Sequence, residues 1–196
     1  MKKFFPIILF LGLTGCATYK SQVVNVEPIH AYRDKATVSD ITVAVDVFEQ
    51  SDKVKSAFYV DLTKKDVRAV QLLVENGSAD NILITRSKIS ASDSAGNEAK
   101  RVNASYVFDR FEKNELAYAF WGFGIFSYMS AEKANEKMKA DWHEKELEEE
   151  KTLPVKRSAS GFVFFETKNH LSGMTLKLDV INLRTNETVE IKVPLS

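Results

Sequence analysis

The feature that most constrains the fold is a strict alternation of apolar and polar residues in several short segments. The alternation is clearest in residues 176–180 and 189–195, and it recurs in residues 41–47. Successive side chains of a β-strand point to opposite faces, so a period of two predicts a strand with one buried face. Because residues 183–187 have a turn-like composition, we expect the last two strands to form a hairpin.

Other apolar segments bring the expected number of strands to about seven or eight. We expect further strands in residues 58–62, 70–74, 82–84, 88–92 and 161–166. Turn signals separate them, and the strongest is the dipeptide Asn76-Gly77. Short strands punctuated by turns are typical of an antiparallel β-sandwich. The sequence therefore predicts a mostly β fold, with residues 38–196 as one domain and residues 16–37 as a polar tether.

A helical insertion is expected to interrupt the strands in residues 112–151. Residues 112–119 have a helical composition, and a longer helix is predicted from Ser130 to about Lys151, with Ser130 as its N-cap. Its apolar residues recur at spacings of three and four and form one narrow stripe, namely Ala131, Ala134, Met138 and Trp142. Pro154 follows the charged end of this segment and is expected to close it.

Residues 1–15 have the organisation of a signal peptide. Lys2 and Lys3 are basic, and the ten residues from Phe4 to Leu13 are mostly apolar. A helix that spans a membrane needs roughly 20 apolar residues, so this segment is too short to be a stable span. We therefore expect it to be cleaved from the mature protein.

The tetrapeptide Leu13-Thr14-Gly15-Cys16 resembles the lipobox of bacterial lipoproteins. This resemblance implies cleavage before Cys16, a diacylglycerol on its sulfur and usually a third acyl chain, so that the protein binds the membrane through acyl chains. Cys16 is the only cysteine, which argues against a role in a disulfide. Ala17 follows it where a retention signal would have aspartate, and the resemblance then implies the outer membrane.

The mature part resembles a loose group of immunoglobulin-like envelope lipoproteins of unknown function. The resemblance lies in the helical segment and in the small residues of 158–161, which precede the aromatic strand that begins at Phe162. It implies an immunoglobulin-like antiparallel β-sandwich with a helical insertion. It implies no biochemical activity.

Charge and motifs narrow the functional classes. Without Lys2 and Lys3 the chain has 25 basic and 27 acidic residues, so we expect no nucleic-acid partner. His30, His143 and His170 are not at metal-ligand spacing. An enzyme would need a pocket that contains at least two of His143, His170, Asp109 and neighbouring acids. The nucleophile-elbow and phosphate-loop motifs are absent from the sequence. We therefore expect no cofactor, no metal and no catalytic site.

One aromatic segment, residues 120–129, has three open interpretations. It can pack as core beneath the helix, form a patch for a protein partner or for self-association, or contact the membrane interface. Its candidate interaction residues are Trp121, Phe123, Phe126, Tyr128 and Met129. The preferred functional prediction is a lipid-anchored, periplasm-facing accessory or protein-binding module of the cell envelope. The alternative is a structural lipoprotein that self-associates and contacts the membrane through this segment.

Overall fold

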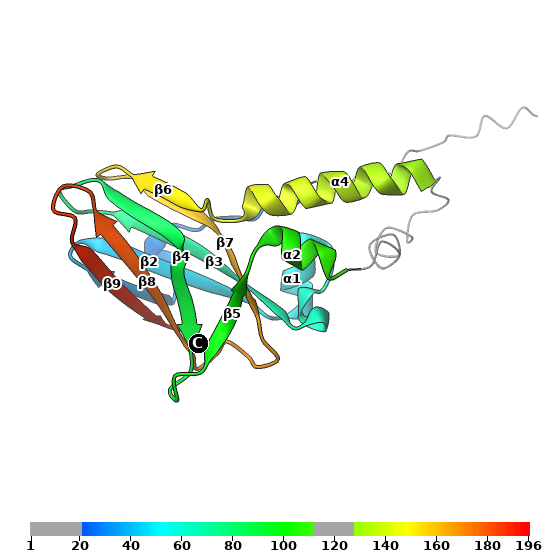
Figure 1. The fold of residues 1–196 in the computed structure, drawn as a ribbon, viewed down its shortest axis with the longest axis horizontal. Helices are drawn as coiled ribbons and strands as arrows, with labels where there is room; N and C mark the ends of the chain where they lie inside the picture. The colour runs from blue at the N-terminus through cyan, green and yellow to red at the C-terminus, as the bar shows by residue number, and fades with distance from the viewer. Residues whose placement is uncertain (1–20, 112–127) are drawn as a thin grey trace, which may run out of the picture.

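The computed structural model describes residues 21–111 and 128–196, which form a mostly β structure (Figure 1). The confirmed strands include the predicted segment at residues 41–47, the aromatic strand and the C-terminal hairpin. The strands of the described part are β1 (Asp34–Val38), β2 (Ile41–Phe48), β3 (Val67–Asn76), β4 (Ile82–Ser92), β5 (Glu98–Val102), β6 (Glu150–Leu153), β7 (Ser158–Glu166), β8 (Thr175–Asn182) and β9 (Thr188–Pro194).

The strands form one antiparallel sheet that curls until it is nearly closed like a barrel. Its order is β1-β2-β3-β7-β5-β4-β8-β9, and β6 pairs with β4 beside this path. The short strand β5 pairs with β7 on one side and with β4 on the other, so it joins the two halves of the sheet. The expected immunoglobulin-like sandwich is therefore not confirmed, because the strand order is continuous across β5.

The interior of this sheet holds the larger of two hydrophobic cores. Alternate residues of β2 and β3 point inward, as the period of two predicted, and they meet the inward residues of β4, β8 and β9. The C-terminal hairpin contributes buried residues from both of its strands, namely Leu176, Leu178, Val180, Ile191 and Val193. Burial of these side chains supplies the main hydrophobic stabilisation of the barrel.

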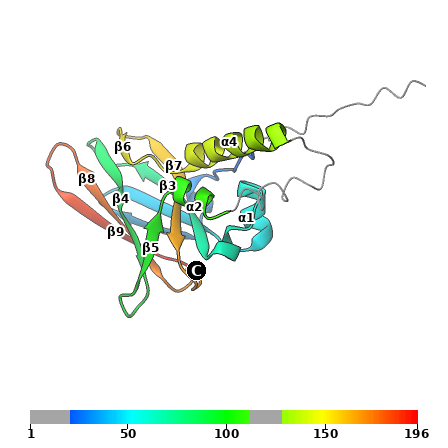
Figure 2. The same ribbon diagram turned by 45° about the vertical axis from the view of Figure 1, so that its right-hand side comes forward.

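A second core lies on the outer face of the sheet, beneath the helices (Figure 2). The helices of the described part are η1 (Ile29–Ala31), α1 (Ser51–Phe58), η2 (Leu62–Lys65), α2 (Ala104–Asp109) and α4 (Tyr128–Lys145). Phe162 and Phe164 of β7 point outward and contact the ring of Phe58 edge-on, and Trp142 of α4 also packs edge-on against Phe58. Strand β7 is therefore buried on both faces, which explains its continuous aromatic sequence.

Two predicted elements differ from the structure. The strand expected in residues 58–62 is wrong, because α1 ends at Phe58 and η2 begins at Leu62. These apolar residues are buried by helices lying on the sheet, and the side chain of Asp61 caps η2 by accepting a hydrogen bond from the Thr63 backbone N–H at 3.1 Å. The segments expected at 82–84 and 88–92 belong to one strand, β4, whose pairing with β8 shifts register between Ile84 and Ile89.

The long helix of the insertion also has different ends from those predicted. Helix α4 begins at Tyr128 instead of Ser130 and ends at Lys145 instead of about Lys151. After the helix, the chain runs beside β7, where the backbone N–H of Leu147 donates a hydrogen bond to the Phe162 carbonyl at 2.9 Å. This bond replaces a further helical one. Residues 148–151 have a helical composition, but the last of them pair with β4 as part of strand β6. Pairing with the sheet thus overrides their helix propensity.

The segment that precedes β1 lies against the domain, although residues 16–37 were expected to be a tether. We call residues 21–33 the strap. The Ser21 hydroxyl donates to the carboxylate of Asp141 on α4, and the Gln22 amide donates to the Tyr59 hydroxyl. The Gln71 side chain of β3 then donates to the Asn25 carbonyl at 3.3 Å. The chain is thus fixed to the fold from Ser21 onward, and β1 begins at Asp34, inside the predicted tether.

Candidate functional site: a polar pocket at the seam of the barrel

The structure leaves the predicted interaction residues largely outside its described part. Cys16, Trp121, Phe123 and Phe126 belong to residues 1–20 and 112–127, which are not described. Tyr128 and Met129 are the first two residues of α4. The lipidation site and the three interpretations of the aromatic segment therefore stay predictions.

The residues singled out for possible chemistry are dispersed over the fold. His143 lies on α4 with its Nδ1 3.4 Å from Glu146, and His170 follows β7 with its Nδ1 3.1 Å from Glu49. Asp109 is at the end of α2, 3.7 Å from the Nζ of Lys139. Within the described residues, no group of three histidine, cysteine or acidic side chains is placed to hold a metal ion.

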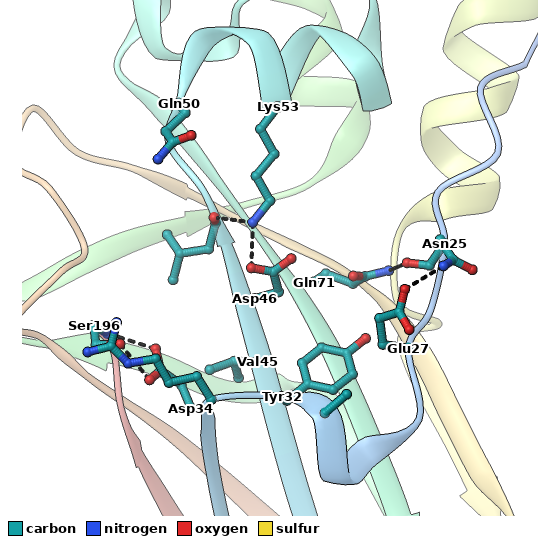
Figure 3. A pocket seen from close by; sticks show the side chains of 13 residues that line it. Asn25, Glu27, Tyr32, Asp34, Val45, Asp46, Gln50, Lys53, Gln71 and Ser196 are labelled. Atoms are coloured by element: carbon teal, nitrogen blue, oxygen red, sulfur yellow. Dashed lines mark hydrogen bonds and ion pairs between the residues drawn. The ribbon is translucent and has the colours of Figure 1, made fainter.

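A polar pocket of about 410 Å³ opens where the curled sheet fails to close (Figure 3). Strand β1 pairs with β2 only as far as Val45, so the last three residues of β2 pair with β3 alone in the described structure. The strap, the start of α1 and Ser196, the second residue after β9, surround this uncovered edge. We call the space the seam pocket, and it is lined by Asn25, Glu27, Ala31, Tyr32, Arg33, Asp34, Val45, Asp46, Val47, Gln50, Lys53, Gln71 and Ser196.

Lys53 of helix α1 lies at the edge of β2 that β1 leaves unpaired. The Nζ of Lys53 donates to the Val47 carbonyl at 3.0 Å and to the carboxylate of Asp46. Both side chains of this ion pair are about one-third exposed or more, at 34% for Lys53 and 41% for Asp46. Lysine at a free strand edge opposes pairing with another chain, so this contact protects the barrel from edge-to-edge association.

The strap forms the opposite wall, and one of its residues is buried there. Tyr32 is only 8% exposed, and its hydroxyl makes no hydrogen bond of acceptable geometry within the described part of the chain. Burial is the main cause that raises the pKa of the phenol. The Glu27 backbone N–H, which lies close to the hydroxyl without good hydrogen-bond geometry, lowers the pKa, and the charges of Asp46 and Glu27 raise it. A buried hydroxyl without a partner is costly, so this atom is a candidate to contact a ligand.

The remaining polar groups of the pocket hold the strap and the ends of the sheet in place. Asn25 donates a hydrogen bond to Glu27 at 2.6 Å, and Gln71, which is 4% exposed, donates to the Asn25 carbonyl. On the other side, Ser196 donates to the Asp34 carboxylate. Figure 3 shows the Tyr32 hydroxyl directed toward the side chains of Gln71 and Glu27.

Sequence reasoning missed this site for a simple reason. The residues that line it come from positions 25–34, 45–53, 71 and 196, so no local motif joins them. Glu27 and Tyr32 also belong to the segment that was expected to be a tether. Asp46, a charged residue near the end of the apolar strand β2, could have indicated a polar site. Such a residue is more often simply solvated, so it does not by itself indicate a pocket.

Comparison with known proteins gives weak likenesses. No protein-family model matches the chain, and no curated protein sequence matches it. The crystal structure of the yjhA protein from Bacillus subtilis shares 13% identity at a TM-score of 0.48, over 84% of this chain and 98% of its own. That of ycdA, a candidate lipoprotein from the same organism, shares 12% at a TM-score of 0.41, over 82% of this chain and 38% of its own. Both TM-scores lie below 0.5, so neither likeness assigns a function.

Among the helices of the described residues, none is long and apolar enough to cross a membrane.

Proposed function

We propose that this chain is a lipid-anchored binding module of the bacterial cell envelope, which holds its ligand in the seam pocket. The observation that carries this proposal is the Tyr32 hydroxyl, which is buried in a polar pocket of about 410 Å³ and has no hydrogen-bond partner of acceptable geometry among the described residues. Pockets that bind small molecules or single side chains commonly have volumes of a few hundred Å³ and a few convergent polar groups. The module faces the periplasm, and the outer membrane is its proposed location.

The lipid anchor is supported by the residues of the lipobox, Leu13-Thr14-Gly15-Cys16. Ser21 is five positions after Cys16, and an extended chain of this length reaches at most about 18 Å. Because Ser21 is held by Asp141 on α4, the anchor would keep this side of the domain close to the membrane surface. The strap that follows Ser21 also forms a wall of the seam pocket, so the anchor and the binding site share one segment.

The self-associating structural lipoprotein stays the alternative. It depends on Trp121 and Phe123, which lie outside the described residues, so the structure adds no observation in its favour.

Photo-crosslinking in living cells tests the binding proposal. A photo-reactive amino acid at Gln50, on the pocket rim, is expected to give a discrete adduct that is absent when the same group replaces Glu187. Glu187 is the control because it is exposed in the β8–β9 turn, at the far end of β9 from Ser196. Adducts of equal yield at both positions, or none at Gln50, would count against the seam pocket as the binding site.

A further inference from the structure

The chemistry of the seam pocket points to a particular class of ligand. Three carboxylates and two cationic side chains line it, namely Glu27, Asp34, Asp46, Arg33 and Lys53. The charges are not equally available. Asp34 accepts both hydrogen bonds of Ser196, and Lys53 is held between Asp46 and the Val47 carbonyl.

Two carboxylates keep an oxygen atom that is not used within the protein. Glu27 receives the Asn25 amide on Oε1, and Asp46 receives Lys53 on Oδ1. Among the residues that the structure describes, the second oxygen of each, Oε2 of Glu27 and Oδ2 of Asp46, accepts no hydrogen bond. These two oxygens favour a donor with positive charge, because charge-assisted hydrogen bonds are stronger than neutral ones.

The Tyr32 hydroxyl provides a third acceptor at the same place. Its ring is buried, its hydroxyl has no partner of acceptable geometry in residues 21–111 and 128–196, and the charges of both Asp46 and Glu27 act on it. In Figure 3 the hydroxyl lies on the side of the pocket where Glu27 and Gln71 converge. A donor group that enters here would satisfy the phenolic oxygen and one carboxylate together.

The apolar part of the lining suits an alkyl chain. Ala31 and Val47 supply aliphatic atoms beside these acceptors, whereas Val45 is 3% exposed and packs mainly into the interior core. A flexible basic side chain has this composition, since its methylene groups pack on apolar surface and its charged end makes the polar contacts.

We infer that the seam pocket binds an ammonium or guanidinium group on an alkyl chain, with Glu27, Asp46 and Tyr32 as acceptors. This inference rests on the proposed function. The group is either a lysine or arginine side chain of a protein partner or a free small amine, which share the same chemistry.

Titration of the full chain, purified in detergent micelles, tests the inference by NMR or calorimetry. The probes are Nα-acetyl-lysine and Nα-acetyl-arginine methylamides, with cadaverine and agmatine as free amines. The norleucine and glutamate methylamides serve as neutral and anionic controls, and calcium serves as a bare cation. Basic probes are expected to bind at least about tenfold more tightly than either control, as one charge-assisted hydrogen bond implies.

Three single variants identify the acceptors. Glu27→Gln and Asp46→Asn are each expected to weaken binding of the basic probes about tenfold, and Tyr32→Phe several-fold. Glu187→Gln, outside the pocket, is expected to change nothing. Because Tyr32→Phe removes only a hydroxyl, it keeps the test valid where a charge change disturbs folding, which circular dichroism would detect.

The outcomes separate the ligand class from the proposed function. Tighter binding of the amino-acid methylamides than of the free amines would support a protein side chain, and the reverse would support a free amine. Neutral or anionic probes, or calcium, binding as tightly as the basic probes would overturn the cation assignment and leave the pocket as a binding site. Unchanged affinity in Glu27→Gln and Asp46→Asn, or no binding of any basic probe, would overturn it too. The crosslink from Gln50 would then decide separately on the proposed function.

Discussion

Ser196 donates two hydrogen bonds to the carboxylate of Asp34, from its backbone N–H at 2.8 Å and from its Oγ at 2.6 Å, across 162 residues of sequence. These bonds join the second residue after β9 to the first residue of β1, and β1 and β9 are the two ends of the strand order. They hold the nearly closed sheet together at the point where backbone pairing stops, and they form one side of the seam pocket.

Replacement of Asp34 by alanine is expected to lower the free energy of unfolding by about 1 kcal/mol. The variant loses two hydrogen bonds, each worth about 0.5–1.5 kcal/mol, but both groups are partly solvated. Urea denaturation measures the change. The matched control is Glu98→Ala, an exposed residue of β5, which should stay within about 0.5 kcal/mol of the wild type. Equal stability of the two variants would show that the seam is not held by Asp34.

Gly161→Ala is expected to destabilise the protein by about 2 kcal/mol or more. A Cβ at this position would lie 2.6 Å from the Leu147 Cα and 2.7 Å from its nitrogen, where the chain leaves α4 and runs beside β7. The backbone itself would have to move, which is costlier than shifting a flexible side chain. Thermal unfolding would reveal the loss, with the exposed neighbour change Ser160→Ala as a control of small effect. A variant as stable as the wild type would disprove this close approach.

Removal of Arg86 should be among the most damaging single changes. Its guanidinium lies 2.8 Å from Glu146, whose side chain is 1% exposed, and it also binds the Leu147 carbonyl at 2.7 Å. Arg86→Met would leave a buried carboxylate without its cation and is expected to cost about 3–5 kcal/mol. In contrast, Arg184 is 71% exposed, and its partner Asp80 keeps a hydrogen bond from Asn182, so Arg184→Met should cost at most about 1 kcal/mol. Similar denaturation midpoints for the two variants would contradict this ranking.

The acid sensitivity of the C-terminal hairpin depends on Glu190. Hydrogen bonds from Lys177 and then Lys192 lower the pKa of this carboxyl from 4.5 to about 2. Because the folded pKa is depressed, the contribution to stability is present above about pH 4.5 and is lost as the pH falls toward 2. Melting temperatures measured between pH 5 and pH 2 should therefore fall less steeply for Glu190→Gln than for the wild type. Parallel curves would show that the lysines do not favour the ionised form.

The sequence predicted the strands better than their arrangement. Alternation fixes which face of a strand is buried, so residues 41–47 and the C-terminal hairpin were found correctly. It contains no information on which strands become neighbours, and β5, which joins β7 to β4, has five residues that show no strong pattern. The strand predicted at residues 58–62 is wrong because Phe58, Val60 and Leu62 are buried in the outer core by the ends of two helices. Their period of two therefore does not reflect strand geometry.

The candidate site was beyond reach of local patterns. Tyr32 lines the pocket only because the strap folds back onto the sheet. Asp46 lines it only because the pairing of β1 with β2 ends at the preceding residue, Val45. Both facts are tertiary. The proposed lipobox at residues 13–16 is a local pattern, so it could be predicted from the sequence, and its processing stays a prediction.

The central claim is that the domain is held at a membrane by the segment that also walls its pocket. Mass spectrometry of the protein from the membranes of the organism that encodes it tests this claim most directly. The N-terminal peptide is predicted to begin at Cys16 and to carry diacylglycerol on its sulfur. A mature protein that begins at another residue, or a Cys16 without an acyl chain, would contradict the account.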